Sequence, residues 1–261
     1  MKLGAVPLKS YGVMMMIGFL IGLYRALRAA RKKGVDPAAV TDAALYSLLS
    51  GVVGARLVFV LLNWPQFRHN LGSLLSVWEG GLSFHGGVLC AVAVVYAYTR
   101  IKRIPFLLMA DTLAPSLAIA YAFTRIGCFL NGCCYGVETN LPWAMRFPEA
   151  LGPRHPTQLY AFAANILIYL LLVRAERWGN AGGSYASGPA FRPEAGKRDG
   201  FVFAAYLAMY SVYRFLIEIL RKGATAEVFA WGLTQAQVVS VVVFLFAAAA
   251  LWRLRRSKTA G

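Results

Sequence analysis

Acidic residues are scarce in this 261-residue sequence, which has 11 Asp and Glu against 27 Lys and Arg. The resulting net charge of +16 could suit a nucleic acid, but the basic residues are spread over several connecting segments. No RNA- or DNA-binding motif accompanies them, so we predict no nucleic-acid partner. The charge is better explained by membrane topology and by attraction to an anionic lipid surface.

Histidine and cysteine are also rare, with three and four residues. Cys90 falls inside an apolar run and is predicted to be an inert small hydrophobic residue. The other three cysteines are grouped as C-x4-C-C at Cys128, Cys133 and Cys134. They follow an apolar run at its outer end, according to the charge pattern described below, and disulfides can persist on that side.

Long apolar runs dominate the rest of the chain. The hydrophobic content is 59% and the mean hydropathy is +0.56. Several runs approach the roughly 20 residues that a helix needs to cross a bilayer. The sequence therefore predicts an all-α polytopic membrane protein, a single integral membrane domain over residues 1–261, with seven transmembrane helices at about 11–30, 43–62, 82–99, 106–124, 157–174, 201–220 and 229–252.

The distribution of basic residues predicts the orientation. Most of them lie in the segments after the first, third, fifth and seventh predicted spans. By the positive-inside rule these segments face the cytoplasm, so the N-terminus is outside and the C-terminus is cytoplasmic. The first span is preceded by few positive charges and followed by no small-residue cleavage site, so no cleavable signal peptide is expected.

One connection is long and polar. Residues 179–199 are rich in Gly, Ser, Pro and charge. Such a composition buries too little apolar surface to offset the entropy of ordering, so we predict a flexible cytoplasmic insertion. Two outer segments, 63–81 and 125–156, are also longer than simple connectors, and loops of that kind often carry function.

A histidine flanked by four glycines opens the third predicted span, in Gly80-Gly81-Leu82-Ser83-Phe84-His85-Gly86-Gly87. An imidazole facing lipid is costly, which favours a functional role for His85. The flanking glycines would let a backbone or a ligand approach it closely. The structural alternative is a tight turn into a helix, with His85 hydrogen-bonded at the membrane surface.

Span six carries a polar stripe. Tyr210, Arg214, Glu218 and Arg221 follow i, i+4, i+8, i+11 and are predicted to share one helix face. A charged residue at mid-membrane costs about 2.5–3.5 kcal/mol on insertion scales, and pairing offsets only part of this. Either the stripe is a structural ion pair, or Arg214 faces a lipid phosphate while Glu218 holds its guanidinium in place.

Other polar residues are predicted at the same outer end. Arg56, next to Gly54, is predicted to be structural rather than catalytic. Arg125 ends span four and opens a glycine-rich loop, which favours an anion site. Tyr11 opens span one and suits an interfacial anchor. A general base and two guanidinium groups meeting here would fit chemistry on a phospholipid head group.

Several motifs together resemble those of one bacterial family. They are Tyr11-Gly12, Gly54-Ala55-Arg56-Leu57, the glycine-flanked His85 segment, Ala110-Asp111 with Ala114-Pro115, Arg125-Ile-Gly with Phe129, Asn131-Gly132 and Gly136, Arg154-His155-Pro156-Thr157-Gln158-Leu159-Tyr160, and Arg214-Phe215 with Glu218 and Arg221. Over nearly its whole length the chain thus resembles the bacterial prolipoprotein diacylglyceryl transferases.

The resemblance implies a seven-span enzyme of the bacterial cytoplasmic (inner) membrane. It would transfer the diacylglyceryl group of phosphatidylglycerol to the lipobox cysteine thiol of a preprolipoprotein and release glycerol phosphate. Its partners would be phosphatidylglycerol, the lipobox segment and membrane lipids, with no cofactor and no metal. His85 would be the base, Arg125 and Arg214 would hold the phosphate, Tyr11 would position the head group, Glu218 would orient Arg214, and Asn131, Gly136 and Tyr210 would complete the substrate-binding set.

The chain departs from the family pattern in the loop after span four. Cys128 stands where the family usually has Asn, Cys133 where it has Glu, and Thr124 where it has Gly before the arginine. Cys128 could form a disulfide with Cys133 or Cys134, or the thiols could be free. A zinc site with His155 matches no common ligand spacing. The alternatives are a paralogue that uses another acceptor or thiol redox chemistry, and a non-catalytic lipid-binding or lipid-transport protein.

Overall fold

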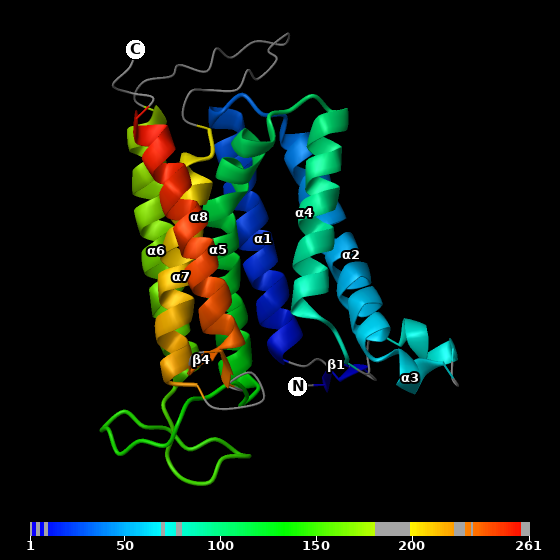
Figure 1. Ribbon diagram of the computed structural model, residues 1–261, viewed down its shortest axis with the longest axis vertical. Coiled ribbons are helices and arrows are strands. Elements are labelled where there is room, and N and C mark those ends of the chain that lie inside the picture. The colour runs from blue at the N-terminus through cyan, green and yellow to red at the C-terminus, as the bar shows by residue number, and fades with distance from the viewer. Residues whose placement is uncertain are drawn as a thin grey trace. The chain divides into compact units, whose positions relative to one another are not determined.

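The computed structural model describes residues 2–3, 6–7, 10–68, 71–76, 80–180, 199–221, 228–230 and 232–256. Within these residues, seven helices are long and apolar enough to cross a membrane, so the predicted all-α class with seven spans is confirmed (Figure 1). They are α1 Ser10–Lys32, α2 Pro37–Leu62, α4 Phe84–Ile101, α5 Phe106–Leu130, α6 Thr157–Asn180, α7 Phe201–Ile219 and α8 Gln235–Arg256.

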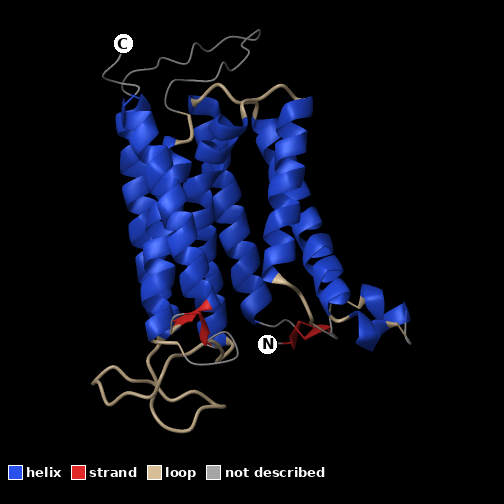
Figure 2. Cartoon of the chain, viewed as in Figure 1, coloured by secondary structure: helices blue, strands red, loops and turns tan. Residues whose placement is uncertain are grey.

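The remaining elements are short. A one-turn helix α3, Trp64–Phe67, and a 3-10 helix η1, Leu71–Leu75, follow α2. Two antiparallel pairs of strands join β1 Lys2–Leu3 to β2 Val6–Pro7 and β3 Val228–Ala230 to β4 Leu233–Thr234. The connection 131–156, all of which is described, contains turns and isolated bridges in place of helix (Figure 2).

Several predicted helix ends were wrong. α2 begins at Pro37 because Asp36 caps it, accepting a hydrogen bond from the Ala38 backbone N–H. α8 begins only at Gln235, since residues 228–230 form a strand. α5 runs on to Leu130, beyond the predicted end near residue 124. Of the predicted insertion 179–199, residues 181–198 lie outside the described residues.

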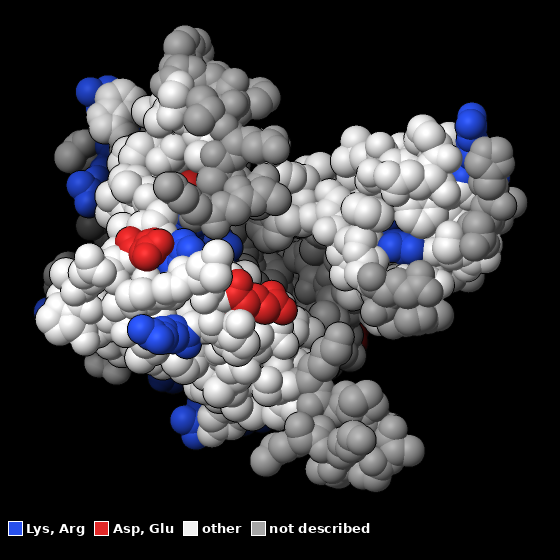
Figure 3. All heavy atoms as spheres, turned by 90° about the horizontal axis from the view of Figure 1, so that it is seen from below, with Lys and Arg blue, Asp and Glu red and all other residues white. Residues whose placement is uncertain are grey.

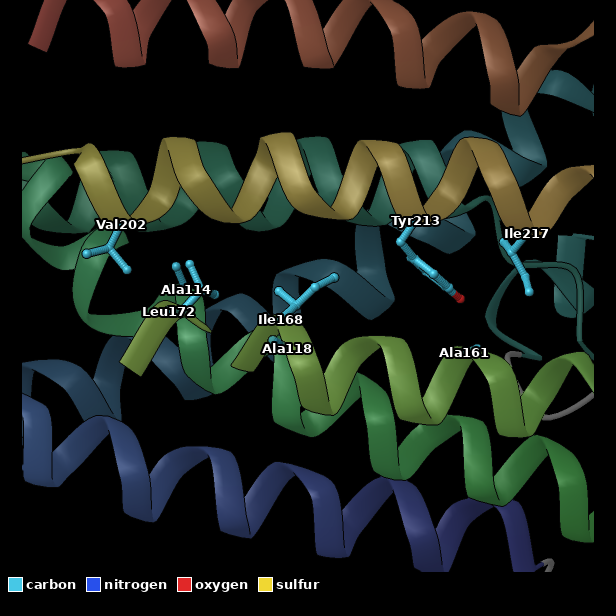
Figure 4. Packing of buried hydrophobic residues seen from close by; sticks show 8 residues of the cluster. All are labelled: Ala114, Ala118, Ala161, Ile168, Leu172, Val202, Tyr213 and Ile217. Atoms are coloured by element: carbon cyan, nitrogen blue, oxygen red, sulfur yellow. The ribbon is translucent and has the colours of Figure 1, made fainter. Parts of the chain in front are cut away.

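The chain divides into two compact units: residues 1–26, 110–184 and 195–261 form the first, and residues 27–109 and 185–194 form the second. In the first unit α7 packs against α6 and α8, and a core cluster joins α5, α6 and α7. Figure 4 shows this cluster, in which alanines of α5 and α6 lie among the larger side chains of α6 and α7: Ala114, Ala118, Ala161, Ile168, Leu172, Val202, Tyr213 and Ile217.

An aspartate of α5 caps the start of α7 in the first unit. Gly200, at the N-cap position of α7, has no side chain to accept a hydrogen bond. The buried Asp111 carboxylate accepts instead from the backbone N–H groups of Gly200, at 2.8 Å, and Phe203, at 2.7 Å. The first N–H groups of a helix otherwise lack partners, so Asp111 ties α7 to α5.

In the second unit α2 and α4 cross at small residues. A Cβ added to Gly86 would lie 2.5 Å from Val58 Cβ and 2.6 Å from the Gly54 carbonyl oxygen. Only glycine allows this approach of the two backbones, as at the small-residue crossings of membrane helices. Apolar side chains of the same helices remain exposed, including Leu49 at 63% and Leu89 at 69%, as expected of a surface that faces lipid.

Candidate functional site

The C-terminal half of α7 carries a buried ion pair. The Arg214 guanidinium donates to the Glu218 carboxylate one turn further along the helix. Glu218 is 2% exposed, and its second oxygen accepts from the Thr234 hydroxyl at 3.4 Å. A carboxylate so enclosed needs such partners to remain charged. The pair therefore fixes the orientation of the Arg214 guanidinium.

Arg221 does not join this stripe, contrary to the sequence prediction. α7 ends at Ile219, and Arg221 forms an isolated bridge with Gly136 of the connection 131–156. The Val137 backbone N–H also donates to the Leu220 carbonyl at 2.8 Å. The helix ends here because its last residues pair with this connection.

Arg125 lies inside α5, not at its end as predicted. Its guanidinium donates to the Tyr121 hydroxyl and lies over the Tyr121 ring, with 4.5 Å between Cζ and the ring centroid. Arg125 Nε is buried and has no hydrogen-bond partner among the described residues. The side chain therefore keeps donor capacity for an anion, which guanidinium groups bind through paired N–H groups.

Aromatic side chains connect the two arginines. The Tyr121 ring of α5 meets the Tyr210 ring of α7 edge-on, with centroids 5.7 Å apart. The Tyr213 hydroxyl interacts electrostatically with both Arg125 and Arg214. Two guanidinium groups from neighbouring helices thus act on one region of the first unit. Such an arrangement favours the binding of phosphate and other oxyanions.

Tyr11 of α1 lies against the C-terminal end of α5. A Cβ at Gly127 would be 3.1 Å from the Tyr11 carbonyl oxygen and 3.2 Å from its Cα, so the two backbones almost touch. The Tyr11 side chain interacts electrostatically with Arg125 and with the thiols of Cys128, Cys133 and Cys134. The predicted neighbourhood of Tyr11 and Arg125 is therefore present in the first unit.

The connection 131–156 packs onto this end of the helices. The buried Gly136 N–H donates to the His155 carbonyl at 2.9 Å, and a Cβ there would lie 2.5 Å from the Leu220 carbonyl oxygen. Gly136 is thus a packing position, whereas Asn131 is exposed. Figure 3 views this end of the molecule, where Lys, Arg, Asp and Glu form separate patches among the other described residues.

Three thiols gather beside Arg125. Sγ atoms of Cys128, Cys133 and Cys134 all lie within 4.8 Å of one another, and all four cysteines, each in the described part of the chain, are free. The predicted disulfide is not formed in this structure. A hydrogen bond from Cys128, aided by the charges of Arg221 and Arg125, holds the pKa of the Cys134 thiol well below its usual value, whereas burial raises the pKa of Cys133.

His85 is the second residue of α4 and belongs to the second unit. The Ser83 side chain caps this helix, accepting from the Gly86 N–H at 3.4 Å. The imidazole is exposed and meets the Phe84 ring edge-on, with centroids 5.8 Å apart. The motif is therefore a capped turn into a helix, and it leaves the ring accessible.

Arg56 has the structural role predicted for it. Arg56 is 7% exposed, and its guanidinium donates to the backbone carbonyls of Ser73, Leu74, Gly80 and Gly81 at 2.5–3.1 Å. One side chain thus satisfies four carbonyl groups of the connection between α2 and α4. The prediction that Arg56 is structural is confirmed.

The sequence is similar to known proteins along almost its full length. A family model described as prolipoprotein diacylglyceryl transferase matches residues 1–253. The chain belongs to this family. Three relatives carry the name phosphatidylglycerol–prolipoprotein diacylglyceryl transferase. That of Solidesulfovibrio magneticus is 36% identical over 98% of this chain and 92% of its own length, that of Clostridioides difficile 33% over 89% and 85%, and that of Thermosynechococcus vestitus 30% over 97% and 91%.

In this member of the diacylglyceryl transferase family, three residues contribute to the site although the sequence did not predict that role for them. Tyr121 accepts from Arg125, and it could have been found because it lies one helical turn earlier. Thr157 and Gln158 were noted only within a motif. Their side chains donate to the carbonyls of Cys134, at 2.8 Å, and Cys133, at 2.7 Å. No local pattern predicts these long-range contacts.

Proposed function

We propose that this protein transfers the diacylglyceryl group of phosphatidylglycerol to the lipobox cysteine thiol of preprolipoproteins and releases glycerol phosphate. Membership of the family supports the reaction. The observation that carries the proposal is the placement of two guanidinium groups, Arg125 and Arg214, around Tyr213 in the apolar helices of the first unit. Cations within a membrane-spanning bundle are costly and suit an anionic lipid.

Arg125 and Arg214 bind the phosphate of the donor lipid. Arg125 brings unused donor capacity at Nε, and Arg214 is held by the enclosed Glu218. Negative charge grows on the departing phosphate oxygen as its bond to carbon breaks. Fixed guanidinium groups stabilise that charge without reorganising, because their positions are already set.

The acceptor reacts as a thiolate, since a thiol is a poor nucleophile. His85 takes the proton from the lipobox thiol. The thiolate sulfur then forms a bond to the glyceryl carbon, the carbon–oxygen bond to phosphate breaks, and its electron pair leaves with glycerol phosphate. The exposed imidazole at the start of α4 supports this role, because a base must be accessible to an external peptide.

The remaining predicted residues act by positioning. Tyr11 orients the head group beside Arg125, and Tyr210 packs the Tyr121 ring that holds Arg125. Asn131 offers an exposed amide to the substrate. Gly136 acts through shape, because any side chain there would displace Leu220 or His155.

The protein is multi-pass. We place it in the bacterial inner membrane, with its N-terminus outside and its C-terminus in the cytoplasm. The basic residues in the segments after α1 and α4 support this orientation. The site then faces the outer leaflet, where the lipobox segment arrives.

The test is transfer of labelled diacylglyceryl from phosphatidylglycerol vesicles to a synthetic lipobox peptide by the purified protein. We expect a thioether-linked lipid on the peptide, identified by mass. His85→Gln should lower the rate by about 100-fold or more, since general bases contribute about 10²–10⁴-fold.

Two controls make the result specific. A peptide with serine in place of the lipobox cysteine should not be lipidated, and the His155→Gln enzyme should retain most activity. Full activity of His85→Gln would contradict the assignment of the base. Lipid binding without any transfer by the folded wild-type protein would favour a non-catalytic lipid-binding role.

A further inference from the structure

The three thiols beside α5 lie at distances that suit a common ligand. Cys133 Sγ and Cys134 Sγ are 3.5 Å apart, and the whole trio lies within 4.8 Å. Cys128 comes from the last turns of α5, and the other two from the turn that follows it. The trio is therefore built by one short segment that reverses direction.

The backbone of this segment is held in place. Cys134 has a φ of +67°, a left-handed conformation that non-glycine residues rarely adopt. The Gln158 side chain donates to the Cys133 carbonyl at 2.7 Å, and the Thr157 hydroxyl to the Cys134 carbonyl at 2.8 Å. Both side chains are buried at the start of α6. The thiols converge because a strained turn is anchored on both carbonyls.

The geometry of a zinc–thiolate site gives the sulfur–sulfur separation with which the trio can be compared. A zinc–thiolate bond of about 2.3 Å in tetrahedral geometry separates two ligand sulfurs by about 3.8 Å. The trio spans 3.5 Å to 4.8 Å at most. Its longest pair would need to close by no more than about 1 Å for three such bonds, a shift that side-chain rotation can provide.

We infer that Cys128, Cys133 and Cys134 form a three-thiolate site for a thiophilic metal ion, Zn²⁺ or Cu⁺. Thiolate ligands select these two ions over hard cations such as Mg²⁺ or Ca²⁺. The bound ion would join the end of α5 to the turn that follows it. This inference does not depend on the proposed transfer reaction, because it rests on the thiols alone.

The surroundings suit such a site. Three thiolates with Zn²⁺ or Cu⁺ carry net negative charge, and Arg221 and Arg125 both interact electrostatically with Cys134. Gln158 Oε1 is buried and has no hydrogen-bond partner among the described residues, while Nε2 of the same amide donates to the Cys133 carbonyl oxygen. A water ligand in the fourth position of Zn²⁺ would offer that oxygen a donor.

The experiment uses the full-length protein, purified in detergent under a phosphine reductant and stripped with a chelator. Co²⁺, as a spectroscopic substitute for Zn²⁺, should bind one per chain with thiolate-to-metal charge-transfer absorption and be displaced by Zn²⁺. A parallel titration uses Cu⁺ against a coloured Cu⁺ chelator. X-ray absorption of the tighter complex should show three sulfur neighbours at about 2.3 Å.

Variants identify the ligands. Each of Cys128→Ser, Cys133→Ser and Cys134→Ser should weaken binding by at least about 100-fold, since loss of an outer-shell partner alone costs about 10–100-fold. Cys90→Ser is the matched control, because Cys90 lies on α4 outside the trio, and its affinity should be unchanged.

A second measurement needs no variant. Metal should protect Cys133 and Cys134 of the wild-type protein from maleimide, and the labelling of the same two thiols in metal-free protein is the reference. No uptake of Zn²⁺, Co²⁺ or Cu⁺ by the wild-type chain would overturn the inference. So would uptake that survives replacement of all three cysteines by serine. These readouts do not involve lipid transfer, so failure of the proposed function leaves them interpretable.

Discussion

Glu218 and Arg214 form an ion pair one turn apart on α7, in which the Glu218 side chain is fully enclosed and the Arg214 side chain is 18% exposed. The difference in exposure indicates a direction of action. Glu218 is shielded and acts on Arg214, whereas Arg214 retains an open side for another partner. The enclosed Glu218 carboxylate thus fixes the position of the partly exposed Arg214 guanidinium.

Replacing Glu218 with glutamine tests this relationship. Glu218→Gln keeps the side-chain size but removes the charge that orients Arg214, so we expect transfer to fall about 100-fold, as for a misplaced catalytic group. The constants kcat and KM for phosphatidylglycerol would be measured in vesicles. Glu149→Gln, at an exposed position of the connection 131–156, should stay within about twofold of wild type. If Glu218→Gln had the kinetics of the wild type, the ion pair would have only a structural role.

Arg56→Lys should destabilise the second unit. A lysine ammonium cannot reach all four carbonyls that the Arg56 guanidinium satisfies. A carbonyl left without a donor costs about 1–3 kcal/mol where it is buried, and less where water can replace the donor. Thermal unfolding in detergent should show a clearly lower midpoint. Arg68→Lys keeps an exposed charge in the connection between α2 and α4 and should change stability by less than about 0.5 kcal/mol.

Gly86→Ala should separate α2 from α4. The added Cβ would meet Val58 Cβ at 2.5 Å and the Gly54 carbonyl at 2.6 Å, and neither can move without shifting a helix. We expect a loss of about 1–3 kcal/mol, as for overpacking. Gly51→Ala on α2 is the contrast, because its Cβ would meet nothing closer than 3.7 Å. It should be neutral or stabilise α2 by up to about 1 kcal/mol. Equal effects of the two changes would argue against a close crossing.

Asp111→Ala should weaken the attachment of α7. It leaves the N–H groups of Gly200 and Phe203 without their acceptor, and loss of an N-cap costs about 0.5–2 kcal/mol. Because Asp111 is buried, we expect the upper part of that range. Asp111→Asn should lose less, since its single carbonyl oxygen still accepts one bond. Amide exchange at the start of α7 would locate the effect, and protection equal to wild type would contradict it.

The seven spans could be predicted because long apolar runs must be helical in a bilayer. Their ends could not. Hydropathy falls at Arg125, which suggested the end of span four, but α5 continues because Tyr121 and the contact of Gly127 with α1 accommodate the polar residues. The helical period predicted that Arg221 shares a helix face with Tyr210, Arg214 and Glu218. Arg221 instead pairs with Gly136 of the connection 131–156.

The candidate site was predicted in part. Charged residues inside apolar runs indicated Arg125, Arg214 and Glu218, because such residues are costly in a membrane. The thiol trio was not predicted as a ligand set, since the spacing C-x4-C-C matches no common pattern. What brings it together is the left-handed backbone of Cys134 and two side chains of α6, which lie more than 20 positions later.

The cap that Asp111 provides to α7 also constrains how the protein is made. The ribosome synthesises Asp111 long before Gly200 and Phe203 emerge, and α5 and α6 insert first. The Asp111 carboxylate is therefore already present as an acceptor when the first turn of α7 forms. We therefore expect the first turn of α7 to depend on α5 during folding, so that the order of synthesis contributes to assembly.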